Sequence, residues 1–267
     1  MEEKAYHLQA DMLKALAHPT RLKILELLCD GERCVCEIEP ALGRRQPNIS
    51  QHLAILRASG LVEARKEGVR TIYHITDRRV LAAMRLVPRH RFVRPTDLHL
   101  AYADCPLSIG RGQTISQPYI VALMTQLARP RAGGRALDIG TGSGYQAAVL
   151  AGLTGEVYSI EILCPLANEA RARLARLGYA NVEVRCGDGY RGWPEQAPFD
   201  AIILAAAPDH IPPALIDQLA PGGHLVLPVG EYEQELVDVE KRPDGSVIKR
   251  NVIPVRFVPM TGESERR

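Results

Sequence analysis

The stretch Arg135–Leu150, RALDIGTGSGYQAAVL, decides the fold of the larger part of this 267-residue chain. A short apolar run ends in three glycines at alternate positions, Gly140, Gly142 and Gly144, and a helix-like run follows them. Glycine allows the backbone to adopt positive φ and to approach a ligand where a Cβ atom would collide. A strand, a glycine loop and a helix in this order are typical of the nucleotide-binding turn of an α/β sheet.

The sequence beyond this loop continues to alternate between short apolar runs and helix-like segments. The expected strands are residues 136–139, 157–160, 182–184, 201–205 and 224–229. Such alternation predicts βαβ units and a parallel sheet that is covered on both faces. Two further strand-like runs, residues 236–240 and 252–258, are expected to close one edge of the sheet. The predicted fold class is therefore α/β, with a Rossmann-like sheet.

The spacing of the glycines indicates which cofactor the loop binds. A dinucleotide fingerprint needs a third glycine at position 145, where this chain has Tyr145. The observed G-x-G-x-G, with Asp138 before it, resembles the first motif of S-adenosylmethionine-dependent methyltransferases. Glu161 ends the next strand, where it can accept hydrogen bonds from ribose hydroxyls, and Asp188 follows Gly187 after the third strand, in place for the adenine amino group. A glycine loop alone also fits an ordinary tight turn, but three motifs at successive strand ends favour the cofactor.

Several segments of the larger part resemble one methyltransferase family closely. The segments are VPRHRFV (87–93), AYADCPLSIGRGQTISQPYIVALM (101–124), ALDIGTGSGYQAAVLA (136–151), GDGYRGWPEQAPFDAII (187–203) and PGGHLVLPVG (221–230). They are similar to protein-L-isoaspartate O-methyltransferase, and the segment 112–119 is the most specific. The resemblance implies methyl transfer from S-adenosyl-L-methionine to the free α-carboxylate of L-isoaspartyl residues in damaged proteins. The resulting ester would then collapse to a succinimide.

The same resemblance implies roles for individual side chains. Ser116 matches the essential serine of the family, and we assign its hydroxyl to orienting the incoming carboxylate. Gln113, Thr114 and Ile115 would line the same pocket, and Gln234 corresponds to a position that can touch the cofactor. A carboxylate is already ionised at neutral pH, so the reaction needs no general base. A structural alternative for Ser116 is the N-cap of the helix that begins near Pro118.

The first 80 residues follow a different pattern, that of a small helical domain with a hairpin. Apolar residues at helical spacing predict a helix around residues 8–16, a second with Thr20 as its N-cap that stops at Asp30, a third that ends at Gly43, and a fourth over residues 47–59. Two alternating runs, residues 61–66 and 71–76, predict a β-hairpin. This order is typical of a winged helix-turn-helix domain.

This front segment resembles the ArsR family of metalloregulatory repressors over about residues 8–80. The motifs are HPTRLKILELL (18–28), ERCVCEIEPALGRRQPNISQHLAILRASGLV (32–62) and RKEGVRTIYHI (65–75). The resemblance implies a homodimer that reads a palindrome in double-stranded DNA. The residues expected to face DNA bases are Asn48, Ser50, Gln51 and His52, and those expected to contact phosphates are Arg65, Lys66 and Arg70. A winged helix that binds another protein is the alternative, but 8 basic and 3 acidic residues over positions 44–79 favour a polyanion.

The cysteines raise the question of a metal site. Cys34 and Cys36 match the thiolate pair with which the ArsR family binds arsenite or antimonite, although residues at i and i+2 diverge on a regular helix. The helix would therefore have to start late or unwind there. The usual third thiolate position holds Glu39, and Cys29 is a possible substitute. Two incidental cysteines at a helix start are the alternative. His52 and His74 are expected to face DNA or solvent rather than a metal.

The sequence as a whole predicts two domains, residues 1–79 and 80–267, in which the larger, α/β domain is a methyltransferase preceded by a small winged helix-turn-helix domain. The charged start and the shortness of the longest apolar run, residues 201–207, predict a cytoplasmic protein without a membrane segment. Its six cysteines are then expected to be thiols, with Cys105, Cys164 and Cys186 as packing residues. Two alternatives stay open: a repressor whose methyltransferase fold only senses S-adenosylmethionine, and an enzyme that methylates arsenite.

Overall fold

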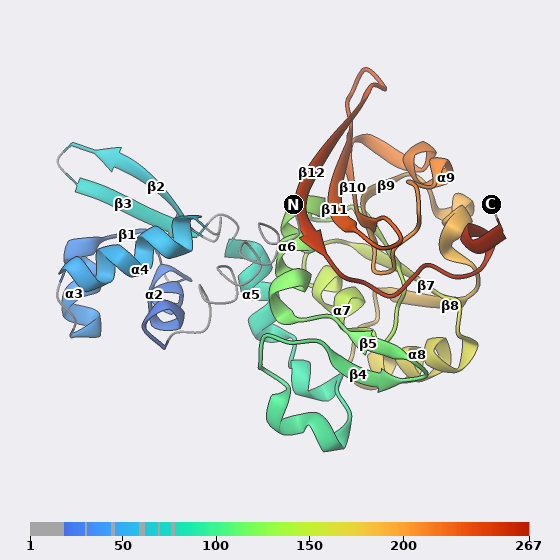
Figure 1. Cartoon of the computed structure of the whole chain (residues 1–267), viewed down its shortest axis with the longest axis horizontal. Coiled ribbons are helices and arrows are strands. Elements are labelled where there is room, and N and C mark those ends of the chain that lie inside the picture. The colour runs from blue at the N-terminus through green and yellow to red at the C-terminus, as the bar shows by residue number, and fades with distance from the viewer. Residues whose placement is uncertain are drawn as a thin grey trace. The chain divides into compact units, whose positions relative to one another are not determined.

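The computed structural model describes residues 19–29, 31–43, 46–58, 62–68, 70–75 and 78–266. The chain divides into two compact units between Ala82 and Ala83, and each is described by itself (Figure 1). Helix α5 (Arg78–Leu86) spans this boundary. The helix predicted around residues 8–16 lies outside the described residues. None of the described helices is long and apolar enough to cross a membrane.

The first unit contains the predicted helices followed by a hairpin. Its elements are α2 (Pro19–Cys29), β1 (Arg33–Cys34), α3 (Val35–Leu42), α4 (Gln46–Ala58), β2 (Val62–Glu67) and β3 (Arg70–Ile75). Strands β2 and β3 pair in antiparallel fashion, and the short strand β1, which the sequence did not predict, pairs with β3. Helix α2 already includes Pro19, so Thr20 lies inside the helix and is not its N-cap as predicted.

A small apolar core holds these helices against the hairpin. Helix α4 contributes Ile49, Leu53 and Leu56, which recur at helical spacing and are fully buried. They pack with apolar residues of α2 and α3 and with Val62 at the start of β2. Gly43 takes φ of +59° and ends α3, so that α3 and α4 form a helix-turn-helix. Glycine tolerates this left-handed conformation without the strain that other residues incur.

The second unit is built around a sheet whose strands lie in the order β12-β11-β10-β9-β6-β7-β8 within residues 83–266. The strands are β6 (Arg135–Ile139), β7 (Glu156–Glu161), β8 (Val182–Cys186), β9 (Phe199–Leu204), β10 (Leu219–Val229), β11 (Gln234–Lys241) and β12 (Val247–Val255). The pairs among β6 to β10 are parallel, as predicted. Strands β11 and β12 add antiparallel pairs and close the edge, which the sequence also predicted.

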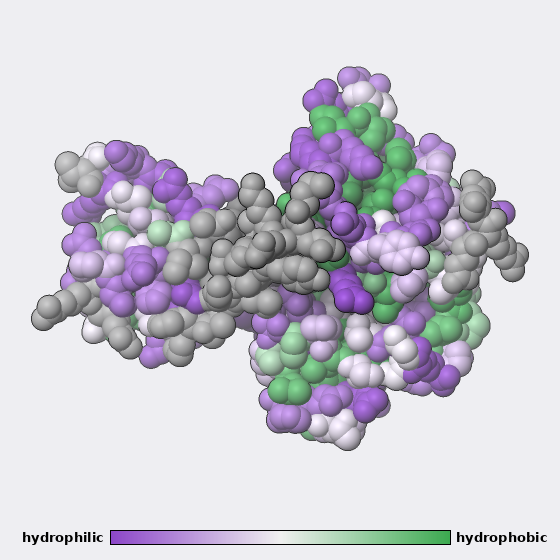
Figure 2. Space-filling view, viewed as in Figure 1, coloured by the Kyte–Doolittle hydropathy of each residue, from purple (hydrophilic) through white to green (hydrophobic). Residues whose placement is uncertain are grey.

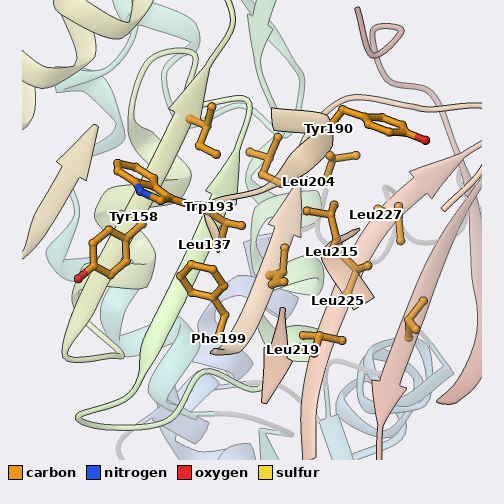
Figure 3. Packing of buried hydrophobic residues seen from close by; sticks show 14 of the residues in the cluster. Leu137, Tyr158, Tyr190, Trp193, Phe199, Leu204, Leu215, Leu219, Leu225 and Leu227 are labelled. Carbon is orange, nitrogen blue, oxygen red and sulfur yellow. The ribbon is translucent and has the colours of Figure 1, made fainter. Parts of the chain in front are cut away.

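Both faces of this sheet are covered. On one face, Leu137 and Ile202 belong to an apolar cluster that includes Trp193 and, from helix α9 (Pro213–Asp217), Leu215 (Figure 3). Side chains alternate between faces along a strand, so Ala136 and its neighbours at alternate positions point to the other face. The helices α6 (Pro118–Ala128), α7 (Tyr145–Ala151) and α8 (Cys164–Arg176) contact the strands there.

A segment without long helices or strands lies between α5 and α6. It contains the 3₁₀ helices η1 (Arg89–Arg91) and η2 (Pro95–Leu100) and a hairpin of β4 (Leu107–Gly110) and β5 (Gln113–Ile115). The hairpin turn places Gly110, Arg111 and Gly112 at positive φ, which two of these residues adopt without strain because they are glycine. The segment therefore presents Ser116 directly after β5 and just before α6. Short 3₁₀ helices η3 (Gly189–Arg191), η4 (Pro194–Gln196) and η5 (Glu263–Arg266) follow later in the chain.

Candidate active site

The carboxyl ends of β6, β7 and β8 bring most of the predicted cofactor residues to one edge of the sheet. The loop with Gly140, Gly142 and Gly144 follows β6, and Glu161 is the last residue of β7. Residues Gly187 and Asp188 follow β8 directly, and the Gly187 backbone N–H donates to the Glu161 carbonyl at 2.9 Å. Neighbouring parallel strands end at the same edge, which is where ligands bind in open α/β sheets.

The glycine loop is shaped by backbone conformations that glycine tolerates. Gly140, Gly142 and Gly144 take φ of +91°, +51° and +88°. A Cβ atom on Gly142 would also lie 3.2 Å from the Ile109 side chain. The Gly142 N–H donates to Glu161 Oε2 at 2.8 Å, so the buried carboxylate of β7 holds the loop that follows β6.

Asp138, the last but one residue of β6, is fully buried beneath this loop. The Ser159 hydroxyl donates to Asp138 Oδ2 at 2.7 Å and lies 2.6 Å from the hydroxyl of Thr141. Within the described residues Asp138 Oδ1 has no hydrogen-bond partner. Burial raises the pKa of Asp138 to about 7, because a charged carboxylate loses its hydration there. A buried acceptor without a donor indicates that the loop is built to hold a further polar group, as a cofactor would supply.

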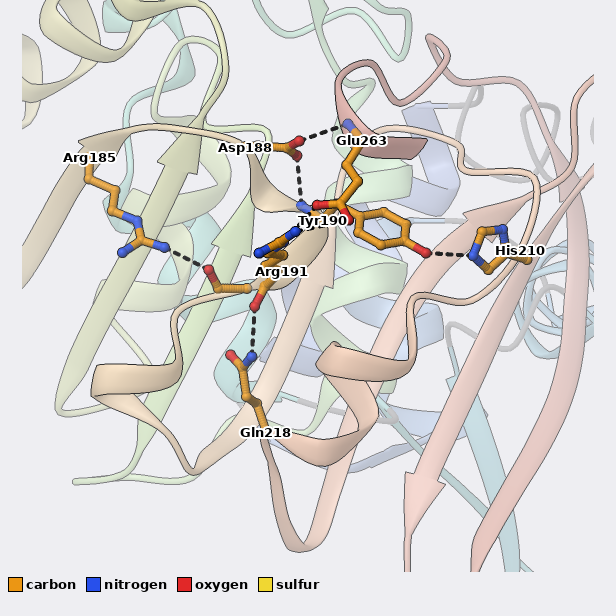
Figure 4. Close-up of polar contacts among 8 residues, drawn as sticks. Arg185, Asp188, Tyr190, Arg191, His210, Gln218 and Glu263 are labelled. Carbon is orange, nitrogen blue, oxygen red and sulfur yellow. Dashed lines mark hydrogen bonds and ion pairs between the residues drawn. The ribbon is translucent and has the colours of Figure 1, made fainter. Parts of the chain in front are cut away.

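Asp188 is held by two backbone donors from separate parts of the chain. Its Oδ1 accepts from the Tyr190 N–H at 2.9 Å and its Oδ2 accepts from the Glu263 N–H at 2.8 Å (Figure 4). Gly262 takes φ of +98°, and a Cβ atom there would lie 2.6 Å from Asp188 Oδ2. The ion pair between Arg191 and Glu263, with 2.7 Å between nitrogen and oxygen, fixes the same segment. The sequence does not predict this C-terminal contact, because nothing local in residues 262–263 points to Asp188.

Ser116 lies on the hairpin that packs against the glycine loop. Ile109 of β4 contacts the position of Gly142, as described above, and in β5 Thr114 is exposed while Ile115 is buried. The Ser116 side chain is half-buried, and its hydroxyl has no hydrogen-bond partner among the described residues. The N-cap of α6 is Gln117, without a side-chain capping bond, so Ser116 is not the N-cap. Its hydroxyl is therefore available to a ligand.

Gln234 does not join the other predicted cofactor residues. It starts β11, which two strands separate from β6 in the sheet order. The amide of Gln234 donates to the Phe257 carbonyl at 3.1 Å and accepts from the Phe257 N–H at 2.6 Å. This buried amide ties β11 to the chain after β12, and its contact with the cofactor stays a prediction.

The structure corrects the prediction that the cysteines are free thiols. Cys164 is joined to Cys186, and Cys34 to Cys36, as disulfides, whereas Cys105 is free. Cys186 pairs with Glu161 across β7 and β8, and Cys164 follows Glu161 by three residues at the start of α8, so the βαβ geometry brings the two together.

The disulfide between Cys34 and Cys36 affects the predicted metal site. Helix α3 begins at Val35, and Cys34 before it is extended, so the helix starts late as the thiolate pair requires. Joined sulfurs have no thiolate for a metal, so binding by Cys34 and Cys36 stays a prediction for their reduced form. The described residues contain no group of three or more His, Cys, Asp or Glu side chains that could hold a metal ion. The side chain of Cys29 lies outside the described part, and Glu39 is half-buried.

Only some of the residues predicted to contact DNA bases lie on the exposed side of α4. Asn48 and Gln51 are exposed and Ser50 is half-buried, but His52 is buried, so its predicted place on the DNA-facing side is wrong. His52 follows Gln51 directly, and because a helix turns by about 100° per residue, His52 lies on the inner face of α4.

The predicted phosphate contacts lie on the exposed hairpin, over which the coloured surface in Figure 2 is mostly hydrophilic. Lys66 and Arg70 are exposed. Arg65 pairs with Glu32 at 2.6 Å, and this hydrogen bond raises the pKa of Arg65. His74 is half-buried and lies 3.4 Å from a Glu63 carboxylate oxygen.

A buried arginine lies beside Ser116, and the sequence did not predict its role. Arg89 is 1% exposed, and its guanidinium donates to the Ser116 carbonyl at 3.0 Å. The signal in the sequence is its position between apolar Val87 and Phe92, both of which are buried. Charged residues in such surroundings are seldom buried unless they are paired.

A wound α/β sheet with a G-x-G-x-G loop and acidic residues at successive strand ends defines a class, the S-adenosylmethionine-dependent methyltransferases. The family model for protein-L-isoaspartate(D-aspartate) O-methyltransferase matches residues 61–265. The chain belongs to this family, and S-adenosyl-L-methionine is its cofactor. A second model, for bacterial regulatory proteins of the arsR family, matches residues 18–64.

Individual relatives agree with this assignment. Protein-L-isoaspartate O-methyltransferase 2 of Polaromonas sp. is 59% identical over 70% of this chain and 90% of its own. Protein-L-isoaspartate O-methyltransferase 1 of Cupriavidus necator is 49% identical over 84% of this chain and 85% of its own. A crystal structure of the beta-aspartate methyltransferase of Plasmodium falciparum, in complex with S-adenosyl-L-homocysteine, is similar with a TM-score of 0.63 and 27% identity, over 78% of this chain and 96% of that one.

The position of Glu161 leads to a test of the cofactor site. We expect Glu161→Gln to weaken the binding of S-adenosyl-L-homocysteine about tenfold or more, since a hydrogen bond to a charged group contributes roughly 1.5–3 kcal/mol. The substitution also weakens the bond that holds Gly142. Titration calorimetry measures the dissociation constant, and Glu183→Gln, at an exposed position of β8, is the matched control. An unchanged constant in Glu161→Gln would remove this residue from the cofactor site.

Proposed function

We propose that this chain transfers a methyl group from S-adenosyl-L-methionine to the free α-carboxylate of L-isoaspartyl residues in damaged proteins. The observation that supports this most is the Ser116 hydroxyl, which has no partner among the described residues and lies on a hairpin packed against the glycine loop. Membership of the protein-L-isoaspartate(D-aspartate) O-methyltransferase family supports the choice of substrate.

The roles we assign to the side chains follow from this chemistry. The cofactor, when bound, supplies an electrophilic methyl group. Glu161, Asp188 and the glycine loop with Asp138 and Gly187 would hold it, while Ser116 donates a hydrogen bond to the carboxylate, and Gln113, Thr114 and Ile115 line the pocket. The acceptor is already an anion at neutral pH, so these residues need only orient it and exclude water.

The experiment that tests the proposal compares two peptides that differ in a single linkage. We expect the protein to transfer a labelled methyl group to a peptide with an L-isoaspartyl residue, and not to the same peptide with a normal aspartyl residue. Ser116→Ala is the control variant. Absence of turnover on the isoaspartyl peptide, with S-adenosyl-L-homocysteine still bound, would favour a regulator that only senses the cofactor.

We also propose that residues 1–79 bind double-stranded DNA as a homodimer, while residues 80–267 carry the methyltransferase. The observation that favours a second function is the helix-turn-helix of α3 and α4, on which Asn48 and Gln51 are exposed. The match of the arsR-family model to residues 18–64 supports the same role. Base contacts from such a helix would specify the site, and the basic hairpin would contact phosphates.

A substitution in the hairpin tests this second function. Arg70 is exposed on β3, so we expect Arg70→Ala to weaken binding to a duplex of any sequence and to reduce the salt dependence of the affinity by about two released ions per homodimer, one from each copy. Fluorescence anisotropy with a labelled duplex at several salt concentrations measures both quantities. Lys249→Ala, an exposed position on β12 of the other unit, is the control. A salt dependence that stays the same in Arg70→Ala would contradict a phosphate contact at this residue.

A further inference from the structure

We propose that Arg89 is a positioning residue that holds the Ser116 hydroxyl at a fixed position relative to the glycine loop. The inference rests on the proposed function, because it assigns a reason for the placement of Ser116. Its basis is one buried guanidinium that contacts the backbone of Ser116 on one side and the helix after the glycine loop on the other.

The contacts of Arg89 gather three backbone carbonyls of the segment before α6. Its Nη1 donates to the Ala101 carbonyl, and its Nη2 donates to the carbonyls of Cys105 at 3.2 Å and Ser116 at 3.0 Å. These acceptors are separated by up to 15 positions in the chain, but they converge on one side chain that is 1% exposed. The guanidinium therefore closes the segment 101–116 into a fixed loop.

The other side of Arg89 faces the cofactor half of the site. Tyr145 is the first residue of α7 and directly follows Gly144. The guanidinium carbon lies 5.9 Å from the centre of the Tyr145 ring, within the range of a cation–π interaction. Phe92, from the same segment as Arg89, packs edge-on against that ring at 5.5 Å. Arg89 thus connects Ser116, on the side of the methyl acceptor, with the glycine loop, on the side of the methyl donor.

The surroundings select arginine rather than another donor. Burial lowers the pKa of Arg89, whereas Tyr145 and Asp104 favour its charged form. Asp104 also accepts from the Tyr119 N–H at 2.9 Å, in the first turn of α6. A planar guanidinium offers donors in fixed directions to several acceptors, which the single ammonium of lysine does not reproduce. With lysine at this position, at least one of the three carbonyls would lose its partner.

The expected consequence is a loss of rate rather than of cofactor binding. A displacement of about 1 Å at a reacting group can cost about 10²-fold in rate. We therefore expect Arg89→Lys to lower kcat for the isoaspartyl peptide by about 10- to 100-fold, while the affinity for S-adenosyl-L-homocysteine stays that of the parent. Added guanidinium ion should restore part of kcat in Arg89→Gly but none in Ser116→Ala. Arg91→Lys, at an exposed position of the same 3₁₀ helix, should keep the parent kcat.

Hydrogen exchange gives a readout that does not depend on turnover. We expect backbone amides of residues 101–117 to exchange faster in Arg89→Lys than in Arg91→Lys, with no change in the strands of the sheet. Unchanged exchange in this segment overturns the inference, even if the parent protein proves inactive and the proposed function fails. If the parent is active, a parent-like kcat in Arg89→Lys, or a failure of guanidinium to rescue Arg89→Gly, overturns it as well.

Discussion

Replacing Ser116 by alanine is expected to lower kcat for methylation of an isoaspartyl peptide by about 10²-fold, the loss typical of one hydrogen bond that strengthens in the transition state. The affinity for S-adenosyl-L-homocysteine should not change, because Ser116 lies on the hairpin and not at the strand ends that would hold the cofactor. In-line attack on a methyl group depends on the direction from which the carboxylate oxygen arrives. A donor that fixes the carboxylate therefore acts on kcat more than on binding.

The fold should tolerate this substitution. The Ser116 hydroxyl has no partner among the described residues, so its removal leaves no buried group without a hydrogen bond. Steady-state kinetics with the peptide, calorimetry with S-adenosyl-L-homocysteine and thermal unfolding separate the three effects. Ser108→Ala is the matched control, since Ser108 lies opposite Thr114 in the same hairpin and is exposed. A parent-like kcat in Ser116→Ala would contradict the role that we assign to its hydroxyl.

The second large effect concerns the stability of the cofactor-free protein and its dependence on pH. The pKa of Asp138 rises from an ordinary 3.8 to about 7 because the carboxyl group is buried. At a pH between these two pKa values, Asp138 keeps its proton in the folded protein but has released it in the unfolded chain. The contribution of Asp138 to stability is therefore fully present below about pH 4 and is lost as the pH rises to 7. The pKa difference corresponds to roughly 4 kcal/mol in the free energy of unfolding.

Asp138→Asn should remove this dependence, since asparagine has nearly the same shape and does not ionise. Urea unfolding at several pH values between 4 and 8 gives the free energy of unfolding of both proteins. We expect the parent to lose stability relative to the variant as the pH rises. Asp217→Asn, at an exposed position of α9, controls for the loss of a charge. If the free energy of unfolding of the parent and that of Asp138→Asn differ by the same amount at every pH, the raised pKa of Asp138 is contradicted.

Most residues of the candidate site could be expected from the sequence because they are coupled to local patterns. The glycine loop, Glu161 and Asp188 each follow a strand, and parallel strands bring their carboxyl ends together without further information. The hairpin and the helix-turn-helix of the first unit are likewise encoded in periods of two and 3.6 residues. His52 was misplaced because its exposure depends on which face of α4 packs on the core, and the neighbouring Gln51 lies about 100° away around the helix, on the exposed part.

The sequence by itself determined the order of the elements, the loop with three glycines at positive φ, and the acidic residues at the strand ends. Tertiary structure decided the pairing of Cys164 with Cys186, the bond from the Glu263 N–H to Asp188, and the contacts of Arg89. Glycine conformations and strand ends depend on neighbouring residues, whose periodicity can be read along the chain. The other contacts join groups up to 75 positions apart, and they form because the packed sheet brings them together and most buried polar groups take a partner.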